Sequence, residues 1–383
     1  MVATLGTQFL TALADNALLF AAIALVRQQG YPAWNGPLLQ DFFVATYILL
    51  APFVGEFADA LPKGRVMILA NIVKCVGALG MCRGVNPFLS YALVGIGAAA
   101  YSPAKYGILG ELAAPEYLVK ANGLIEVSTV AAILLGAVAG GALTDWSIEG
   151  TLIAITGCYA AAALSALIIP RLKRAVPVAR FSVIASVETF ASQTRALLGN
   201  PNARLSLIGT GLFWGAGAAL RFLVIAWVPV ALKVTNNRLP AFLTAMVAAG
   251  IVVGAILAAR FVRIEVVHRA LPAGILIGVG VCLLPLAGTL PQAFALMAFV
   301  GTCSGFFVVP LDALLQRQGE DGLGVGSAIA IQNLFENLSM LALVSGYTAA
   351  SFMKVPVNDI AVGFGLVLAL SMGALTLMRP TTR

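Results

Sequence analysis

Several charged side chains lie inside segments that are otherwise apolar. Asp15 sits near the middle of FLTALADNALLFAAIALV, residues 9–26, and is followed by Asn16. The other charged residues of this kind are Lys105, Glu126, Arg221 and Glu336. A carboxylate attracts an ammonium group, whereas arginine and lysine bind phosphate, arginine through two parallel hydrogen bonds. Charges of both signs predict a binding site for a charged or zwitterionic molecule.

Polar stripes at helical spacing accompany these charges. Three sets share one helix face each: Gln8, Thr11, Asp15; Asn122, Glu126, Thr129; and Gln332, Glu336, Ser339. Buried ion pairs that tie helices together would explain any one set. Because charges recur in several segments, we favour a shared polar cavity. Lys74 is its weakest member, because a lysine can extend its ammonium to the membrane surface.

The composition predicts an integral membrane protein. Of 383 residues, 60% are hydrophobic and 10% charged, and the mean hydropathy is +0.97, whereas soluble domains carry about 25% charged residues. The net charge of +7 does not indicate nucleic acid, because the basic residues flank apolar runs.

Twelve apolar runs are each long enough to cross a bilayer of about 30 Å as a helix of about 20 residues. They lie near Leu5–Val26, Phe42–Ala60, Val66–Cys82, Phe88–Leu109, Asn122–Leu143, Thr151–Ile169, Leu205–Leu232, Pro240–Ala259, Ala270–Ala287, Ala293–Leu315, Ser327–Ala349 and Val357–Met378. The predicted fold is an all-α membrane protein with two pseudo-symmetric six-helix halves, residues 1–170 and 205–383. The linker, 171–204, has apolar residues at helical spacing, which predicts an amphipathic helix on the membrane surface.

The basic residues in the loops predict the orientation. With both termini in the cytoplasm, fifteen Lys and Arg residues fall on the cytoplasmic side and five on the opposite side, as the positive-inside rule expects. The first residues, MVATLGTQ, lack the basic leader of a signal peptide, so we expect the first span to be retained.

The two halves look like sequence repeats. Pro103 and Lys105 recur 207 positions later as Pro310 and Asp312, and the same shift places Asp15 beside Arg221. Such repeats are common in transporters.

Other chemistry has little support in the sequence. The single histidine, His268, lies in a basic loop, and the five cysteines lack the spacing of metal ligands. No ATPase phosphate loop is present, so we expect neither a metal nor a cofactor. An integral-membrane enzyme remains an alternative class.

The loop after the second span, GEFADALPKGRV, resembles the signature loop of the major facilitator superfamily. The resemblance implies a gating loop formed by Gly55, Asp59, Gly64 and Arg65. Gly64 comes later after Asp59 than in the usual pattern, and Ala258 stands where the second half would carry an Asp.

A second resemblance covers nearly the whole chain. ADNALLFA, YILLAPFVGEFAD, KGRVMILAN, GAAAYSPAKYGILGEL, VKANGLIE, FWGAGAALRF, VVGAILAA and FFVVPLDALLQ are similar to the bacterial lysophospholipid transporter family of that superfamily. It implies a flippase that moves lysophosphatidylethanolamine and related lysolipids inward across the inner membrane by alternating access. It also implies a separate acyltransferase–acyl-carrier-protein synthetase that reacylates them.

A zwitterionic lysolipid fits the charged residues. Asp15, Glu126 and Glu336 would meet its ammonium, and Lys105 and Arg221 its phosphodiester, with Asp15 and Arg221 facing each other across the cavity. The alternative is a cation-coupled carrier for a drug or small metabolite, with Asp15 or Glu336 as the proton or sodium site.

Two glycine pairs concern the lipid tail. Gly136 and Gly140, with Gly250 and Gly254, would line a seam between two neighbouring helices that parts to admit a lipid, or would serve rigid packing.

Overall fold

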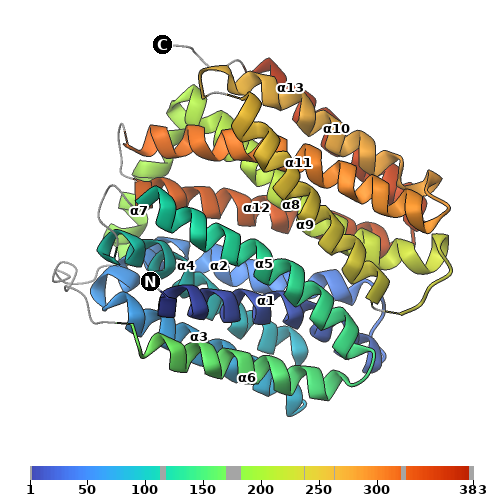
Figure 1. The fold of residues 1–383 in the computed structure, drawn as a ribbon, viewed down its shortest axis with the longest axis horizontal. Coiled ribbons are helices and arrows are strands. Elements are labelled where there is room, and N and C mark those ends of the chain that lie inside the picture. The colour runs from blue at the N-terminus through green and yellow to red at the C-terminus, as the bar shows by residue number, and fades with distance from the viewer. Residues whose placement is uncertain are drawn as a thin grey trace. The chain divides into compact units, whose positions relative to one another are not determined.

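The protein's structure is a computed structural model that describes residues 2–112, 118–169, 183–236, 238–262, 264–320 and 325–378. Within these ranges it contains thirteen α-helices, two short 3-10 helices and no β-strand (Figure 1). The all-α fold predicted from the sequence is confirmed.

Each predicted span coincides with one helix. The first six are α1 (Val2–Gln28), α2 (Asn35–Ala60), α3 (Lys63–Cys82), α4 (Pro87–Leu112), α5 (Leu118–Thr144) and α6 (Ile148–Ala166). The last six are α8 (Pro201–Ala231), α9 (Arg238–Phe261), α10 (Leu271–Cys282), α11 (Leu290–Glu320), α12 (Val325–Phe352) and α13 (Val357–Leu377). Eight of the described helices are long and apolar enough to cross a membrane, which agrees with a multi-pass membrane protein.

One predicted span is shorter than expected. The run Ala270–Ala287 is α-helical only from Leu271 to Cys282 and continues as the 3-10 helix Leu284–Leu286. Pro285 lies inside that turn. Because proline lacks a backbone N–H and clashes with the preceding turn, it ends the α-helix.

Local signals set the ends of several helices. The Asn200 side chain accepts hydrogen bonds from the backbone N–H groups of Asn202 and Ala203, and Pro201 occupies the first turn of α8. Ser147 caps α6 by accepting from the N–H of Gly150. Capping of this kind satisfies backbone donors that a helix start leaves unpaired.

The linker contains the predicted helix. α7 spans Val183–Gly199, whereas Phe181, with the rest of 170–182, lies outside the described residues. On the predicted apolar face of α7, Ile184 and Val187 are exposed, whereas Leu197 is buried. The predicted apolar face is therefore only partly free for contact with a membrane.

The chain divides into two compact units. The first comprises Met1–Pro32 and Phe42–Ala191, and the second Ala33–Asp41 and Ser192–Arg383. The start of α2 therefore belongs with the second unit. The predicted boundaries, 1–170, 171–204 and 205–383, stay a prediction.

The helices pack in the same pattern within each unit. In the first, α1 packs against α5 and α6, and α3 against α4 and α6. In the second, α8 packs against α12 and α13, and α10 against α11 and α13. These are corresponding helices of the two predicted repeats, so the packing is pseudo-symmetric.

The interpretation of the glycine pairs as one lipid seam is wrong. A Cβ added at Gly136 would lie 2.5 Å from the carbonyl oxygen of Leu13, and one at Gly140 would lie 2.7 Å from Ala17, so both glycines pack against α1. Each pair therefore serves rigid packing inside its own unit, the alternative kept open above.

The second pair packs in the same manner. A Cβ at Gly250 would lie 2.5 Å from the carbonyl oxygen of Ala298, and Gly254 faces the carbonyl oxygen of Thr302, so α9 lies directly against α11. Small residues allow this close approach of helix backbones.

Candidate functional site

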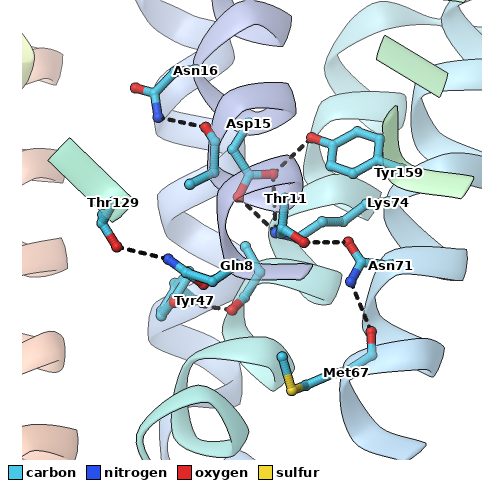
Figure 2. Close-up of polar contacts among 12 residues, drawn as sticks. Gln8, Thr11, Asp15, Asn16, Tyr47, Met67, Asn71, Lys74, Thr129 and Tyr159 are labelled. Atoms are coloured by element: carbon cyan, nitrogen blue, oxygen red, sulfur yellow. Dashed lines mark hydrogen bonds and ion pairs between the residues drawn. The ribbon is translucent and has the colours of Figure 1, made fainter. Parts of the chain in front are cut away.

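The first polar cluster surrounds Asp15 on α1 (Figure 2). Lys74 of α3 donates to both carboxylate oxygens, with its Nζ 2.7 Å from Oδ2 and 3.0 Å from Oδ1. The Tyr159 hydroxyl of α6 donates to Oδ1 at 2.7 Å. The carboxylate thus joins three helices of the first unit.

Lys74 does not extend to the membrane surface. Its side chain is 1% exposed, and its Nζ lies 5.1 Å from the ring centroid of Tyr101 and 5.8 Å from that of Tyr159. The expectation that Lys74 extends its ammonium to the membrane surface is therefore wrong. A buried ammonium is tolerated because a carboxylate neutralises it and two ring faces attract it.

The rest of the α1 stripe ties the helix to its neighbours. Thr11 donates to the Asn71 side chain of α3 at 2.9 Å, and Gln8 donates to Thr129 of α5 at 2.9 Å. Asn16 donates to the carbonyl of Ala12 at 2.8 Å, inside its own helix. Gln8 and Thr11 therefore hold α1 against α5 and α3, whereas the Asn16 bond lies within α1.

Asp15 retains capacity for a further partner. Its side chain is 28% exposed, and a carboxylate offers about four acceptor sites. A hydrogen-bond donor that approaches from the exposed side can therefore bind it without displacing Lys74 or Tyr159.

The second unit contains a different cluster. Gln332 on α12 donates through one nitrogen to Oδ1 of Asp312 on α11, at 2.7 Å, and to Oε1 of Glu336, at 2.9 Å. The Glu336 side chain is 8% exposed. An amide nitrogen thus lies between two acidic side chains.

The remaining predicted site residues are placed less completely. Lys105 on α4 and Arg221 on α8 are partly buried, and Glu126 lies on α5 with its side chain outside the described part of the chain. Asp15 belongs to the first unit and Arg221 to the second. Their predicted pairing across a cavity therefore stays a prediction.

The four residues predicted to form a gating loop flank the start of α3, and their gating role stays a prediction. Gly64 and Arg65 fall in its first turn; Arg65 is exposed, and a Cβ at Gly64 would lie 3.3 Å from the Ile169 side chain. Gly55 and Asp59 lie near the end of α2, and their side chains are outside the described set.

The cluster around Asp15 contains a residue, Tyr159, that the sequence analysis missed. Tyr159 lies in an apolar run and carries no spacing signal, because its role depends on how α6 packs against α1. Asp312 was noted only as the repeat counterpart of Lys105. Among the described residues, no group of three or more His, Cys, Asp or Glu residues could bind a metal ion.

Comparison with known proteins places these clusters in context. The sequence profile of the Major Facilitator Superfamily matches residues 4–344. A lysophospholipid transporter, LplT, of Salmonella arizonae is 54% identical over 375 residues, which cover 98% of this chain and 94% of the relative. LplT of Escherichia coli O1:K1 / APEC is 53% identical over the same shares.

Solved transporters have a similar fold at low identity. The nucleoside transporter NupG is 12% identical, with a TM-score of 0.72 over 98% of this chain and 99% of that chain. An inward-facing bacterial homolog of the human lysosomal transporter Spinster is 14% identical, with a TM-score of 0.66 over 98% and 93%.

Proposed function

Because the chain belongs to the Major Facilitator Superfamily, and within it to the family of the lysophospholipid transporters it matches, we propose that it moves lysophospholipids between membrane leaflets. The identity of more than half the aligned residues, over 98% of the chain, carries this proposal. The substrate is a single-chain phospholipid such as lysophosphatidylethanolamine.

Asp15 supplies the acceptor for the headgroup ammonium. Lys74 and Tyr159 fix the carboxylate from the protein side, so the headgroup ammonium donates to it from the exposed side. Lys105 and Arg221 bind the phosphodiester, and Asn16, Glu126 and Glu336 complete the polar surface. The headgroup then crosses by alternating access, which is the common mode of two-repeat transporters.

Basic residues in the loops support the orientation of the chain, and the resemblance to lysophospholipid transporters supports the direction of transport and the membrane. We assign both termini to the cytoplasm and the protein to the bacterial inner membrane, with transport toward the cytoplasmic leaflet. A separate acyltransferase–acyl-carrier-protein synthetase then reacylates the lysolipid. The protein acts as a carrier, and turnover of lipid by the purified protein would contradict that.

The second candidate function is cation-coupled transport. Glu336 is 8% exposed and shares the amide of Gln332 with Asp312. Two acidic side chains close together favour uptake of a proton or a sodium ion. This function is distinguished from facilitated lipid movement by its dependence on an ion gradient.

The test is transfer of labelled lysophosphatidylethanolamine in reconstituted vesicles. The lipid is placed in one leaflet, and its movement is followed with and without proton and sodium gradients. Protein-free vesicles are the control. Transfer above this control supports the proposal, and gradient-dependent transfer adds coupling. If no lysolipid is transferred but a water-soluble amine is taken up, the lysolipid proposal is wrong and the protein is a drug or metabolite carrier.

A further inference from the structure

A second buried carboxylate lies in the second turn of α2. Asp41 is 8% exposed and lines a cavity of about 360 Å³. The cavity is formed by Trp34, Leu38, Asp41, Ser345, Thr348, Ala349 and Phe352. All seven residues belong to the second unit, and none is part of the clusters described above.

Asp41 is poorly compensated for a carboxylate at this depth. The Ser345 hydroxyl donates to Oδ2 at 3.2 Å, whereas Oδ1 is buried without a hydrogen-bond partner among the described residues. Buried acids are ordinarily paired with a cation or with several donors, as Asp15 is with Lys74 and Tyr159. This oxygen can therefore accept a hydrogen bond from a bound ligand.

The other walls of the cavity are apolar or aromatic. Trp34 and Phe352 meet edge to face, with ring centroids 5.4 Å apart, and Leu38 and Ala349 add aliphatic surface. The Thr348 hydroxyl donates to the carbonyl of Val344 at 2.8 Å, which leaves its oxygen lone pairs available. An acceptor pair beside aromatic walls suits a cationic group attached to a hydrocarbon chain.

We propose that this cavity is a docking site for a primary ammonium borne by a single-chain lipid, separate from the Asp15 site. The ammonium donates to Oδ1 of Asp41 and to the Thr348 hydroxyl oxygen, and the chain lies along Trp34 and Phe352. This inference rests on the proposed function for the identity of the lipid, lysophosphatidylethanolamine.

The position of Asp41 along α2 fits that ligand. It lies six residues after Asn35, the first residue of the helix, which is about 9 Å along the axis at 1.5 Å per residue. The headgroup layers together make a bilayer about 10–15 Å thicker than its hydrocarbon core. Asp41 directly precedes Phe42, where the predicted apolar span begins, so we place it where headgroup and acyl chain meet, and the site would favour ethanolamine over glycerol headgroups at the first contact.

The test measures affinities of the purified full-length protein in detergent for lysophosphatidylethanolamine and lysophosphatidylglycerol. Asp41→Asn should weaken one of the two binding steps of the ethanolamine lipid about tenfold, leave the step at Asp15 in place, and leave binding of the glycerol lipid unchanged, because only the ethanolamine lipid has an ammonium. Asp359→Asn, an exposed acid in the first turn of α13, is the matched control and should change neither. An equal change for both lipids, or no change, would overturn the site.

Two further arms separate this site from the proposed function. Dodecylamine and dodecanol test the Asp41 site without a phospholipid. Asp41→Asn should lower the affinity for dodecylamine about tenfold and leave the affinity for dodecanol unchanged. If the wild type binds neither lysolipid, the proposed function fails. The comparison of dodecylamine with dodecanol still shows whether Asp41 binds an ammonium. A contrary result would be that sodium chloride or free ethanolamine stabilises the wild type but not Asp41→Asn. That result would mean that the site binds a small cation and not a lipid.

A variant that spares the carboxylate guards against misfolding. Thr348→Val keeps the shape of the side chain and removes one acceptor. It should weaken the binding of the ethanolamine lipid and of dodecylamine severalfold, and leave the binding of lysophosphatidylglycerol and dodecanol, which have no ammonium, unchanged. Unchanged amine binding in a folded Thr348→Val protein would contradict the proposed geometry.

Discussion

The two polar clusters lie on helices that do not correspond in the repeated fold, α1, α3 and α6 in the first unit and α11 and α12 in the second, and they solve the problem of buried charge differently. In the first unit, a lysine and a tyrosine donate to one carboxylate. In the second, an amide donates to two carboxylates. Helix packing is therefore pseudo-symmetric, whereas the chemistry is not.

The difference assigns different roles to the two clusters. An ion pair with a fully buried ammonium contributes charge neutrality, so its loss should affect folding as well as transport. The Gln332 amide contributes hydrogen bonds to charged groups, each of which is weaker than a buried ion pair. Substitutions in the first cluster should consequently destabilise the protein more than those in the second.

The largest effect is expected from Asp15→Asn. It leaves the Lys74 ammonium, 1% exposed, with a neutral carbonyl, so the free energy of unfolding should fall by about 3 kcal/mol. Transport of ethanolamine lysolipids should fall as well. Unfolding in detergent, followed by helix signal, measures the first effect, and vesicle transfer measures the second.

A double-mutant cycle identifies the cause. Adding Lys74→Met to Asp15→Asn removes the buried charge that has lost its partner. The double variant should therefore lose clearly less free energy of unfolding than the sum of the losses of the two single variants. Additive losses would mean that the carboxylate and the ammonium act independently, and the contrast between the clusters would disappear.

An intermediate effect is expected from Gln332→Leu in the second cluster. It removes hydrogen bonds of 2.7 and 2.9 Å to two acidic groups, so the free energy of unfolding should fall by about 2 kcal/mol. Gln28→Leu, on the exposed last residue of α1, should change it by less than about 0.5 kcal/mol. A loss larger than that of Asp15→Asn would reverse the ranking of the clusters.

The smallest effect separates two tyrosines that both face Lys74. Tyr159→Phe removes one hydrogen bond to Asp15 while Lys74 remains, so the loss should be about 1 kcal/mol. Tyr101→Phe removes a buried hydroxyl that makes no hydrogen bond to Asp15, so it should cost less than Tyr159→Phe. Thermal unfolding of both variants tests this, and equal losses would indicate that the rings, rather than the Tyr159 hydroxyl, support the ion pair.

The spans were predictable because the length of an apolar run can be read from the local sequence alone. Twenty apolar residues predict a crossing helix whatever surrounds them, and even the shortened α10 had a local cause in Pro285. The cost of Asp15 in an apolar segment was equally visible, since the side chain alone determines it.

The partners of Asp15 were not predictable in the same way. Which cation it meets depends on the rotation and contacts of α3 and α6, which no spacing within α1 encodes. Lys74 was undervalued for this reason, and Tyr159 was missed. The glycine pairs were misassigned because small residues indicate a close neighbour without saying which helix it is.

The contact between α9 and α11 has a mechanical consequence. Added Cβ atoms at Gly301 and Gly305 would run into the carbonyl groups of Val247 and Ile251, so the backbones touch from both sides. Backbones this close exchange Cα–H···O contacts and leave no room for one helix to slide along the other. We expect α9 and α11 to move as one rigid body during transport. Spin labels on the two helices should show the same narrow distance distribution with and without lysolipid.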